Sequence, residues 1–167
     1  MKSVLLFRHA DATFDVKYKN DYERPLTHEG IEDAKKIGQY LAQFYTTPDI
    51  VVTSSATRAL ETITYAIKSG KWNSKLKIEK QIYGGRPDFL LILINEQQER
   101  YDSLCLVGHE PNFSLFVSKA TDISYFDMPT ASVVKINFDV EQWNEVVFGF
   151  GSLEYFIKSK ELQLKIR

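Results

Sequence analysis

Short apolar runs alternate along this chain with longer segments in which apolar residues recur every three or four positions. Such an alternation is typical of strands and helices that follow one another in β-α-β units. The expected strands are Val4–Phe7, Ile50–Thr53, a weaker one near Leu76–Glu79, Ser103–Val107, Val133–Phe138 and Val146–Phe150. The expected helices are Glu29–Tyr45, Ala56–Ile67, Asp88–Gln98 and a segment that begins near Pro111.

The order of these elements predicts the fold class. Helical crossovers between the early strands imply a mostly parallel sheet that is covered on both faces. The last two strands, separated by Asp139–Gln142, are typical of an antiparallel hairpin at one edge. We therefore expect an α/β fold, a three-layer α/β/α sandwich with a mostly parallel central sheet.

Composition narrows the class of protein. A chain of 167 residues with 44% hydrophobic content suits one domain over residues 1–167, because there is ample material for a core and no repeat or linker. A net charge of −1 gives no global field for nucleic acid or an anionic membrane. The single cysteine, Cys105, lies in an apolar run and is expected in the core. No segment is long and apolar enough to span a bilayer, so we expect a cytoplasmic protein.

Two of the three histidines directly follow predicted strands. His9 follows Val4–Phe7, and His109 follows Ser103–Val107 with one glycine between them. Ligands of open α/β sheets bind at the carboxyl ends of the strands. If these two strands are parallel neighbours, the two imidazoles meet at one ligand. The third histidine, His28, is expected on the surface at a helix start.

Three arginines stand where they can bind an anion beside these histidines. Arg8 ends the first strand, and Arg58 lies in the first turn of a helix opened by small hydroxyl residues. Free N–H groups at such a helix start attract anions, and a guanidinium adds a bidentate fork. Arg24 lies in a turn that Pro25 makes rigid. Each residue alone has an ordinary structural explanation; together, in a neutral chain, they predict a phosphate site.

The segment Asp11–Glu23 is the predicted rim of this site. Its aromatic residues Phe14, Tyr18 and Tyr22 recur every four positions among charged ones. This spacing favours a short helix that packs its aromatic side on the body over a surface that docks a partner.

Four motifs together resemble the histidine phosphatase superfamily, and in particular its SixA-type phosphohistidine phosphatases. The motifs occur in the order that the family shows and are Arg8-His9-Ala10-Asp11-Ala12, Arg24-Pro25-Leu26-Thr27, Thr53 to Thr62 and Val107-Gly108-His109-Glu110-Pro111-Asn112. The resemblance implies a phosphoglycerate-mutase-like fold. Ala10 departs from the family's usual glycine and is compatible with the loop unless a glycine-only conformation is required there.

The resemblance implies a covalent mechanism. His9 would attack phosphorus and become phosphorylated, while Arg8, Arg24, Arg58 and His109 bind the phosphoryl oxygens and water then releases phosphate. No metal or other cofactor is expected, because the cationic side chains supply the electrostatics. The stretch Ile82 to Arg86 carries no acidic proton donor. The imidazole of a protonated phosphohistidine leaves as a neutral ring and needs no such donor. A phosphohistidine on a protein partner is therefore the favoured substrate.

Two other functions remain open. A phosphomonoesterase acting on a small phosphorylated metabolite would need a proton donor, for which the candidates are Asp11, Asp88 and Glu110. A catalytically idle module that only binds phosphorylated partners would need the arginines but not a positioned imidazole. The presence of His9 argues against that module.

Overall fold

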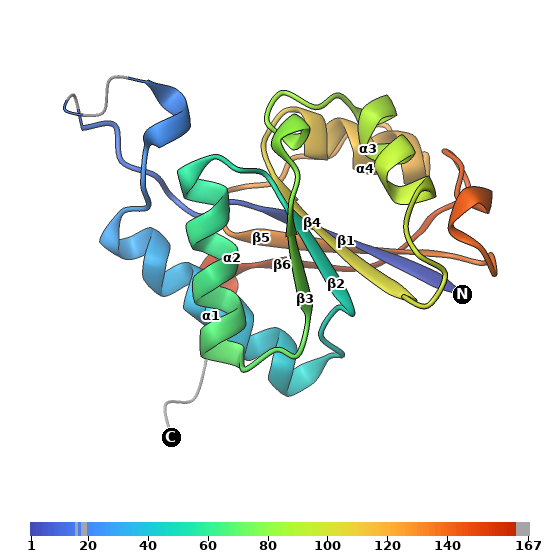
Figure 1. Cartoon of the computed structure of the whole chain (residues 1–167), viewed down its shortest axis with the longest axis horizontal. Coiled ribbons are helices and arrows are strands. Elements are labelled where there is room, and N and C mark those ends of the chain that lie inside the picture. The colour runs from blue at the N-terminus through green and yellow to red at the C-terminus, as the bar shows by residue number, and fades with distance from the viewer. Residues whose placement is uncertain (16, 18–19, 163–167) are drawn as a thin grey trace.

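The computed structural model describes residues 1–15, 17 and 20–162. In this part of the chain a six-stranded sheet lies between two layers of helices, as the α/β/α prediction requires (Figure 1). The strands are β1 (Lys2–Arg8), β2 (Ile50–Thr53), β3 (Lys75–Ile78), β4 (Ser103–Gly108), β5 (Ser132–Phe138) and β6 (Ser152–Lys158). The α-helices are α1 (His28–Phe44), α2 (Thr57–Gly70), α3 (Pro87–Asn95) and α4 (Asn112–Thr121).

The sheet has the strand order β3-β2-β4-β1-β5-β6. Strands β3, β2, β4 and β1 pair in parallel, whereas β5 is antiparallel to both β1 and β6. The one reversed strand is therefore second from the edge and not at the edge itself. Because β1 and β4 are parallel neighbours, their carboxyl ends meet, and Arg8 is paired with Gly108.

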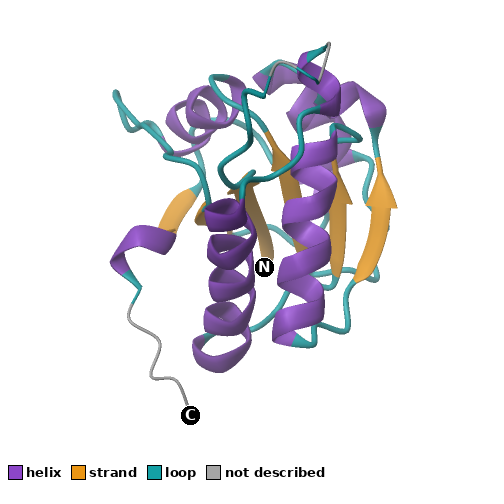
Figure 2. Ribbon diagram, turned by 90° about the vertical axis from the view of Figure 1, so that its left-hand side faces the viewer, coloured by secondary structure: helices purple, strands orange, loops and turns teal. Residues whose placement is uncertain are grey.

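Alternate residues of the central strands fill two cores. Leu5 and Phe7 face the layer formed by α1 and α2, while Val4 and Leu6 face the layer formed by α3 and α4. Figure 2 shows α1 and α2 lying side by side in front of the sheet. They approach closely at Gly38, where a Cβ atom would lie 2.1 Å from the carbonyl oxygen of Ala66.

The prediction of a last strand at Val146–Phe150 is wrong, and so is the hairpin turn at Asp139–Gln142. The chain instead crosses to β6 through a longer connection that contains a 3₁₀ turn, Trp143–Glu145. Val146 is buried in the core beneath α3, and Asn95 donates to the carbonyl oxygens of Trp143 and Val146. Within the predicted strand only Val146 is fully buried, whereas Val147 and Phe150 are exposed. A short apolar run does not distinguish such a connection from a strand of the sheet.

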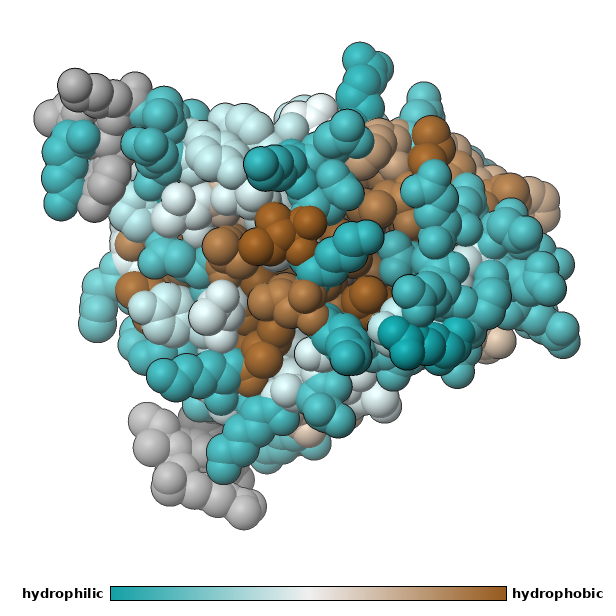
Figure 3. Space-filling view, in the orientation of Figure 1, coloured by the Kyte–Doolittle hydropathy of each residue, from teal (hydrophilic) through white to brown (hydrophobic). Residues whose placement is uncertain are grey.

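Strand β3 forms the exposed edge of the sheet. Its sequence alternates Lys75, Leu76, Lys77 and Ile78, all exposed. Figure 3 shows apolar surface gathered in the middle of this face, where Figure 1 draws β3, with hydrophilic residues around it. Lysines on an edge strand oppose pairing with another chain.

Candidate functional site

The two histidines that follow β1 and β4 lie next to each other at the carboxyl edge of the sheet, with their ring planes tilted by 50°. Their ring centroids are 5.3 Å apart. His9 is 7% exposed and His109 is 9% exposed. The pairing of β1 with β4 explains this contact between residues so far apart in the sequence, because each histidine comes directly after its strand.

His9 is held in one orientation by hydrogen bonds to both ring nitrogens. Its Nδ1 lies 2.7 Å from the carbonyl oxygen of Ala10, so Nδ1 carries the proton and donates it. Arg58 Nε donates to His9 Nε2 across 3.3 Å, and Nε2 therefore presents its lone pair. Burial, together with the charges of Arg58, Arg8 and Arg24, lowers the pKa of His9 to about 4, so the ring is neutral at pH 7.

The backbone after His9 is fixed by helix α2. The N–H of Ala10 donates to Thr62 Oγ1 at 2.9 Å, and Thr62 donates in turn to the carbonyl oxygen of Arg58. Ala10 is fully buried and does not have a positive φ. The alanine therefore fits this loop without strain, although the family's usual residue is glycine.

Arg58 and Arg8 approach the histidines from different elements. Arg58 lies in the first turn of α2 and is 5% exposed. Arg8 ends β1; its Nη1 donates to the carbonyl oxygen of Met128 at 2.7 Å, and its buried Nε has no partner among the described residues. That N–H is therefore a buried donor without an acceptor in the part of the chain that the structure describes. Burial lowers the pKa of Arg8, but an arginine stays charged at pH 7.

Arg24 joins the group through the 3₁₀ turn Asp21–Glu23. Its Nε donates to Asp21 Oδ1 at 3.0 Å, and its guanidinium lies over the Phe14 ring, 4.3 Å from the centroid. The predicted aromatic helix is absent from the described part of this segment, where Phe14 is 83% exposed. Tyr18 lies outside the described residues.

These groups line one pocket with a volume of about 330 Å³. All five predicted site residues line it. The complete lining is Arg8, His9, Asp11, Ala12, Phe14, Arg24, Arg58, His109, Glu110 and Thr130. Three cations and two neutral imidazoles in a space of this size suit a small anion with several oxygen atoms. Among the described residues, no group of His, Cys, Asp and Glu could hold a metal ion.

Ser54 is the main polar partner of His109. The Oγ of this fully buried serine lies 2.8 Å from His109 Nε2 and also accepts the N–H of Ala56. Burial, followed by the charges of His9 and Arg58, lowers the pKa of His109 to about 3. His109 is therefore neutral in the ligand-free protein.

The three candidate proton donors differ in position. Asp88 does not line the pocket, and it pairs instead with Lys119 on α4. Glu110 lines the pocket, but both of its carboxylate oxygens accept hydrogen bonds from Ser114. Asp11 also lines the pocket and accepts the hydroxyl of Thr27 at 2.9 Å.

The sequence did not point to Asp21 or Tyr83, although both contact the predicted site. Asp21 bonds both Arg24 and Arg58, and Tyr83 donates to Asp21. The spacing of Asp21 and Arg24, three residues apart, was the one available signal. Ser54 and Thr62 belonged to a quoted motif, but nothing in the sequence assigned them a partner.

Two sequence comparisons with known proteins give matches. The family model "Histidine phosphatase superfamily (branch 1)" matches residues 4–82. An uncharacterised protein of Mycobacterium tuberculosis is 29% identical over 118 residues, which are 71% of this chain and 72% of that protein.

Solved structures share the fold over nearly the whole chain. The SixA protein of Agrobacterium tumefaciens has a TM-score of 0.81 at 22% identity, covering 94% of this chain and 97% of its own. The protein histidine phosphatase SixA complexed with tungstate has a TM-score of 0.78 at 20% identity, covering 96% and 99%. Mycobacterial glucosyl-3-phosphoglycerate phosphatase, complexed with VO3, has a TM-score of 0.67 at 12% identity, covering 93% and 98%.

At these identities the solved structures establish the fold, which is that of the phosphoglycerate-mutase-like histidine phosphatases. The family model adds a similarity in sequence, and the matched residues 4–82 include Arg8, His9, Arg24 and Arg58. The resemblance seen in the sequence motifs is thereby confirmed: the histidine phosphatase superfamily model matches residues 4–82, and the SixA structures share the fold.

Proposed function

We propose that this protein is a phosphatase that hydrolyses phosphohistidine on a protein substrate through a phosphorylated His9. The observation that carries the proposal is the state of the His9 ring. Nδ1 donates to the Ala10 carbonyl, and Nε2 is unprotonated and accepts Arg58 Nε, in a pocket lined by three arginines. A neutral imidazole fixed in this way is an activated nucleophile for phosphorus.

In the first step His9 Nε2 attacks phosphorus and the bond from phosphorus to the substrate imidazole breaks. The electron pair of that bond goes to the leaving ring, which departs neutral when its other nitrogen is already protonated. Arg8, Arg24 and Arg58 stabilise the charge on the phosphoryl oxygens. Water then attacks the phosphorus of phospho-His9, which releases inorganic phosphate and restores the ring.

His109 assists as a hydrogen-bond donor to the phosphoryl group. The pKa of its ring is low in the ligand-free protein because burial and cationic neighbours disfavour the charged form. A bound phosphoryl dianion supplies the opposite charge and raises that pKa. We expect His109 to take up a proton as the substrate binds, and loss of one such donor to cost on the order of a hundredfold in rate.

A phosphomonoesterase remains the second candidate function. Glu110 and Asp11 place carboxyl groups at the pocket, where one of them would protonate an alkoxide leaving group. A protein of the same fold is named a glucosyl-3-phosphoglycerate phosphatase, and that name supports a small phosphate ester as the alternative substrate. Against it, both Glu110 oxygens are engaged as acceptors by Ser114.

The test compares wild type, His9→Ala and His28→Ala on a protein that carries labelled phosphohistidine. We expect wild type and His28→Ala to release phosphate and to carry a transient label that is labile to acid and stable to base. His9→Ala should do neither. His28 is the matched control because it is an exposed histidine at the start of α1.

Three outcomes would contradict the proposal. Label on a residue other than His9 would reject the nucleophile. Efficient hydrolysis of a phosphate ester that Glu110→Gln abolishes would favour the phosphomonoesterase. Phosphate binding by wild type with no turnover of either substrate would indicate a module that only binds phosphorylated partners.

A further inference from the structure

Asp21 holds the guanidinium groups of Arg24 and Arg58 together. Its Oδ1 accepts Arg24 Nε and lies 3.0 Å from Arg24 Nη2. Its Oδ2 accepts Arg58 Nη2 at 2.8 Å, and its backbone carbonyl accepts Arg58 Nη1 at 2.7 Å. One residue of a short 3₁₀ turn thus bonds two arginines that come from a loop and from helix α2.

The carboxylate lies outside the pocket that the two arginines line. Asp21 is not among the lining residues, and its side chain is 52% exposed. Each of the three guanidinium nitrogens of Arg58 donates one hydrogen bond: Nε to His9, and Nη1 and Nη2 to Asp21. Since each Nη carries two N–H groups, one on each remains for a ligand.

Two guanidinium groups that converge on one anion repel each other while the pocket is empty. A carboxylate shared between them offsets this repulsion and fixes the planes of both forks. Partial burial opposes ionisation, but hydrogen bonds from Tyr83 and Arg58 and the charges of both arginines lower the pKa of Asp21 to about 2. The carboxylate therefore stays charged over the whole working range of pH.

Tyr83, which follows the 3₁₀ turn Lys80–Ile82, contacts both Asp21 and His109. Its hydroxyl donates to Asp21 Oδ2 at 2.8 Å. Its ring lies edge-on to His109, with the centroids 5.4 Å apart. The residue therefore connects the Asp21 carboxylate to the second histidine of the site.

We propose that Asp21 is a positioning residue that holds Arg24 and Arg58 in the geometry that binds the phosphoryl group, with Tyr83 as its support. The proposal rests on the proposed function only in that these two arginines bind a phosphate-like anion. It assigns Asp21 no contact with the substrate and no proton transfer.

The test measures the affinity for inorganic phosphate and for tungstate by calorimetry, so that it does not depend on turnover. We expect Asp21→Asn to weaken anion binding by about tenfold or more, because misplacement of a binding group by about 1 Å is costly. Asp21→Glu should restore part of the loss, and Tyr83→Phe should lose less than Asp21→Asn. Glu23→Gln, an exposed carboxylate in the same 3₁₀ turn, should bind like wild type.

A double-mutant cycle separates positioning from a general loss of structure. In an Arg58→Ala background, Asp21→Asn should cost less than it does alone, because one of the two arginines it holds is gone. Thermal unfolding of each variant would show whether the fold is intact. An equal cost in both backgrounds would overturn the proposal.

The remaining outcomes distinguish failure of the positioning role from failure of the proposed function. Tighter anion binding by Asp21→Asn would mean that Asp21 competes with the ligand, and would overturn the proposal. If wild type binds phosphate and Asp21→Asn weakens it, but phosphohistidine is not hydrolysed, the positioning role stands and the proposed function fails. Absence of anion binding by wild type would overturn both.

Discussion

At the scale of single residues, the pocket keeps its two histidines neutral although arginines surround them. Burial lowers the pKa of His9 to about 4 and that of His109 to about 3. The same cations that favour an anionic ligand disfavour an imidazolium ion. His9 Nε2 is therefore unprotonated at pH 7 and accepts Arg58 Nε. In the proposed mechanism His109 takes up a proton only when the charged ligand binds.

This arrangement makes stability depend on pH with a defined sign. The pKa of His9 is lower in the folded protein than the ordinary histidine value of 6.5, so the unfolded chain binds more protons between pH 4 and 6.5. The free energy of unfolding should therefore fall as the pH is lowered through this range. Chemical denaturation at pH about 7 and about 5 measures the loss. The loss of unfolding free energy between these two pH values should be smaller in His9→Gln than in wild type.

His28→Gln is the control for this measurement, because it removes an exposed histidine outside the site. It should show the same pH dependence as wild type. An undiminished loss of stability in His9→Gln would contradict the role given to burial.

At the scale of elements, helix α2 organises the site through its first turns. Arg58 contacts His9, Glu61 accepts the N–H of Leu26, and Thr62 accepts the N–H of Ala10. Two loops that carry predicted site residues are therefore attached to the same helix. The short motif from Thr53 to Thr62 encodes this attachment as well as the anion site.

Thr62→Val should show how much one such attachment contributes to stability and to phosphate binding. It leaves the buried N–H of Ala10 without an acceptor, which should destabilise the protein by about 1–3 kcal/mol and weaken phosphate binding. Urea denaturation measures the first effect and calorimetry the second. Thr64→Val is the matched control. Like Thr62, Thr64 donates its hydroxyl to the carbonyl oxygen four residues earlier, here that of Leu60. Unlike Thr62, it is exposed and has no hydrogen bond to a loop in the described part of the chain. Equal losses in both variants would refute the attachment.

Periodicity predicted most of these elements because the central strands are buried on both faces and the helices have one apolar side. It placed His9, His109 and Arg58 correctly, since each follows a strand or opens a helix. It failed at Val146–Phe150, which is an irregular connection with only Val146 buried, and at Asp21, whose partner Arg58 comes from a distant segment. Contacts of that kind depend on tertiary structure and leave no local pattern.

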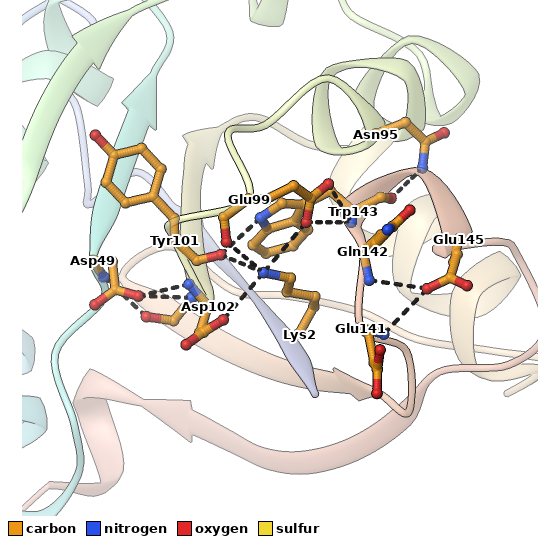
Figure 4. A network of polar contacts seen from close by, with 11 residues as sticks. Lys2, Asp49, Asn95, Glu99, Tyr101, Asp102, Glu141, Gln142, Trp143 and Glu145 are labelled. Carbon is orange, nitrogen blue, oxygen red and sulfur yellow. Dashed lines mark hydrogen bonds and ion pairs between the residues drawn. The ribbon is translucent and has the colours of Figure 1, made fainter.

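At the scale of the whole molecule, the two ends of the sheet serve different purposes. The carboxyl end carries the pocket, and the amino end carries the polar network drawn in Figure 4. There Lys2, 2% exposed, donates to the carbonyl oxygens of Glu99 and Tyr101 and to Asp102. Trp143 donates its indole N–H to the same Tyr101 carbonyl. The network ties the start of β1 to the loop before β4 and to the connection after β5.

Lys2→Met should therefore separate stability from ligand binding. The variant removes one donor from the carbonyl oxygens of Glu99 and Tyr101, of which the second keeps the Trp143 indole N–H. The carboxylates of Glu99 and Asp102, 52% and 79% exposed, can be hydrated. We expect a loss of about 1–3 kcal/mol in unfolding free energy, smaller than for a fully buried ion pair. Phosphate affinity should be unchanged, because the pocket lies at the other end of β1. Lys35→Met, which removes an exposed lysine paired with Glu32, should leave both quantities unchanged. A loss of phosphate affinity in Lys2→Met without a loss of stability would show that the two ends of the sheet are coupled.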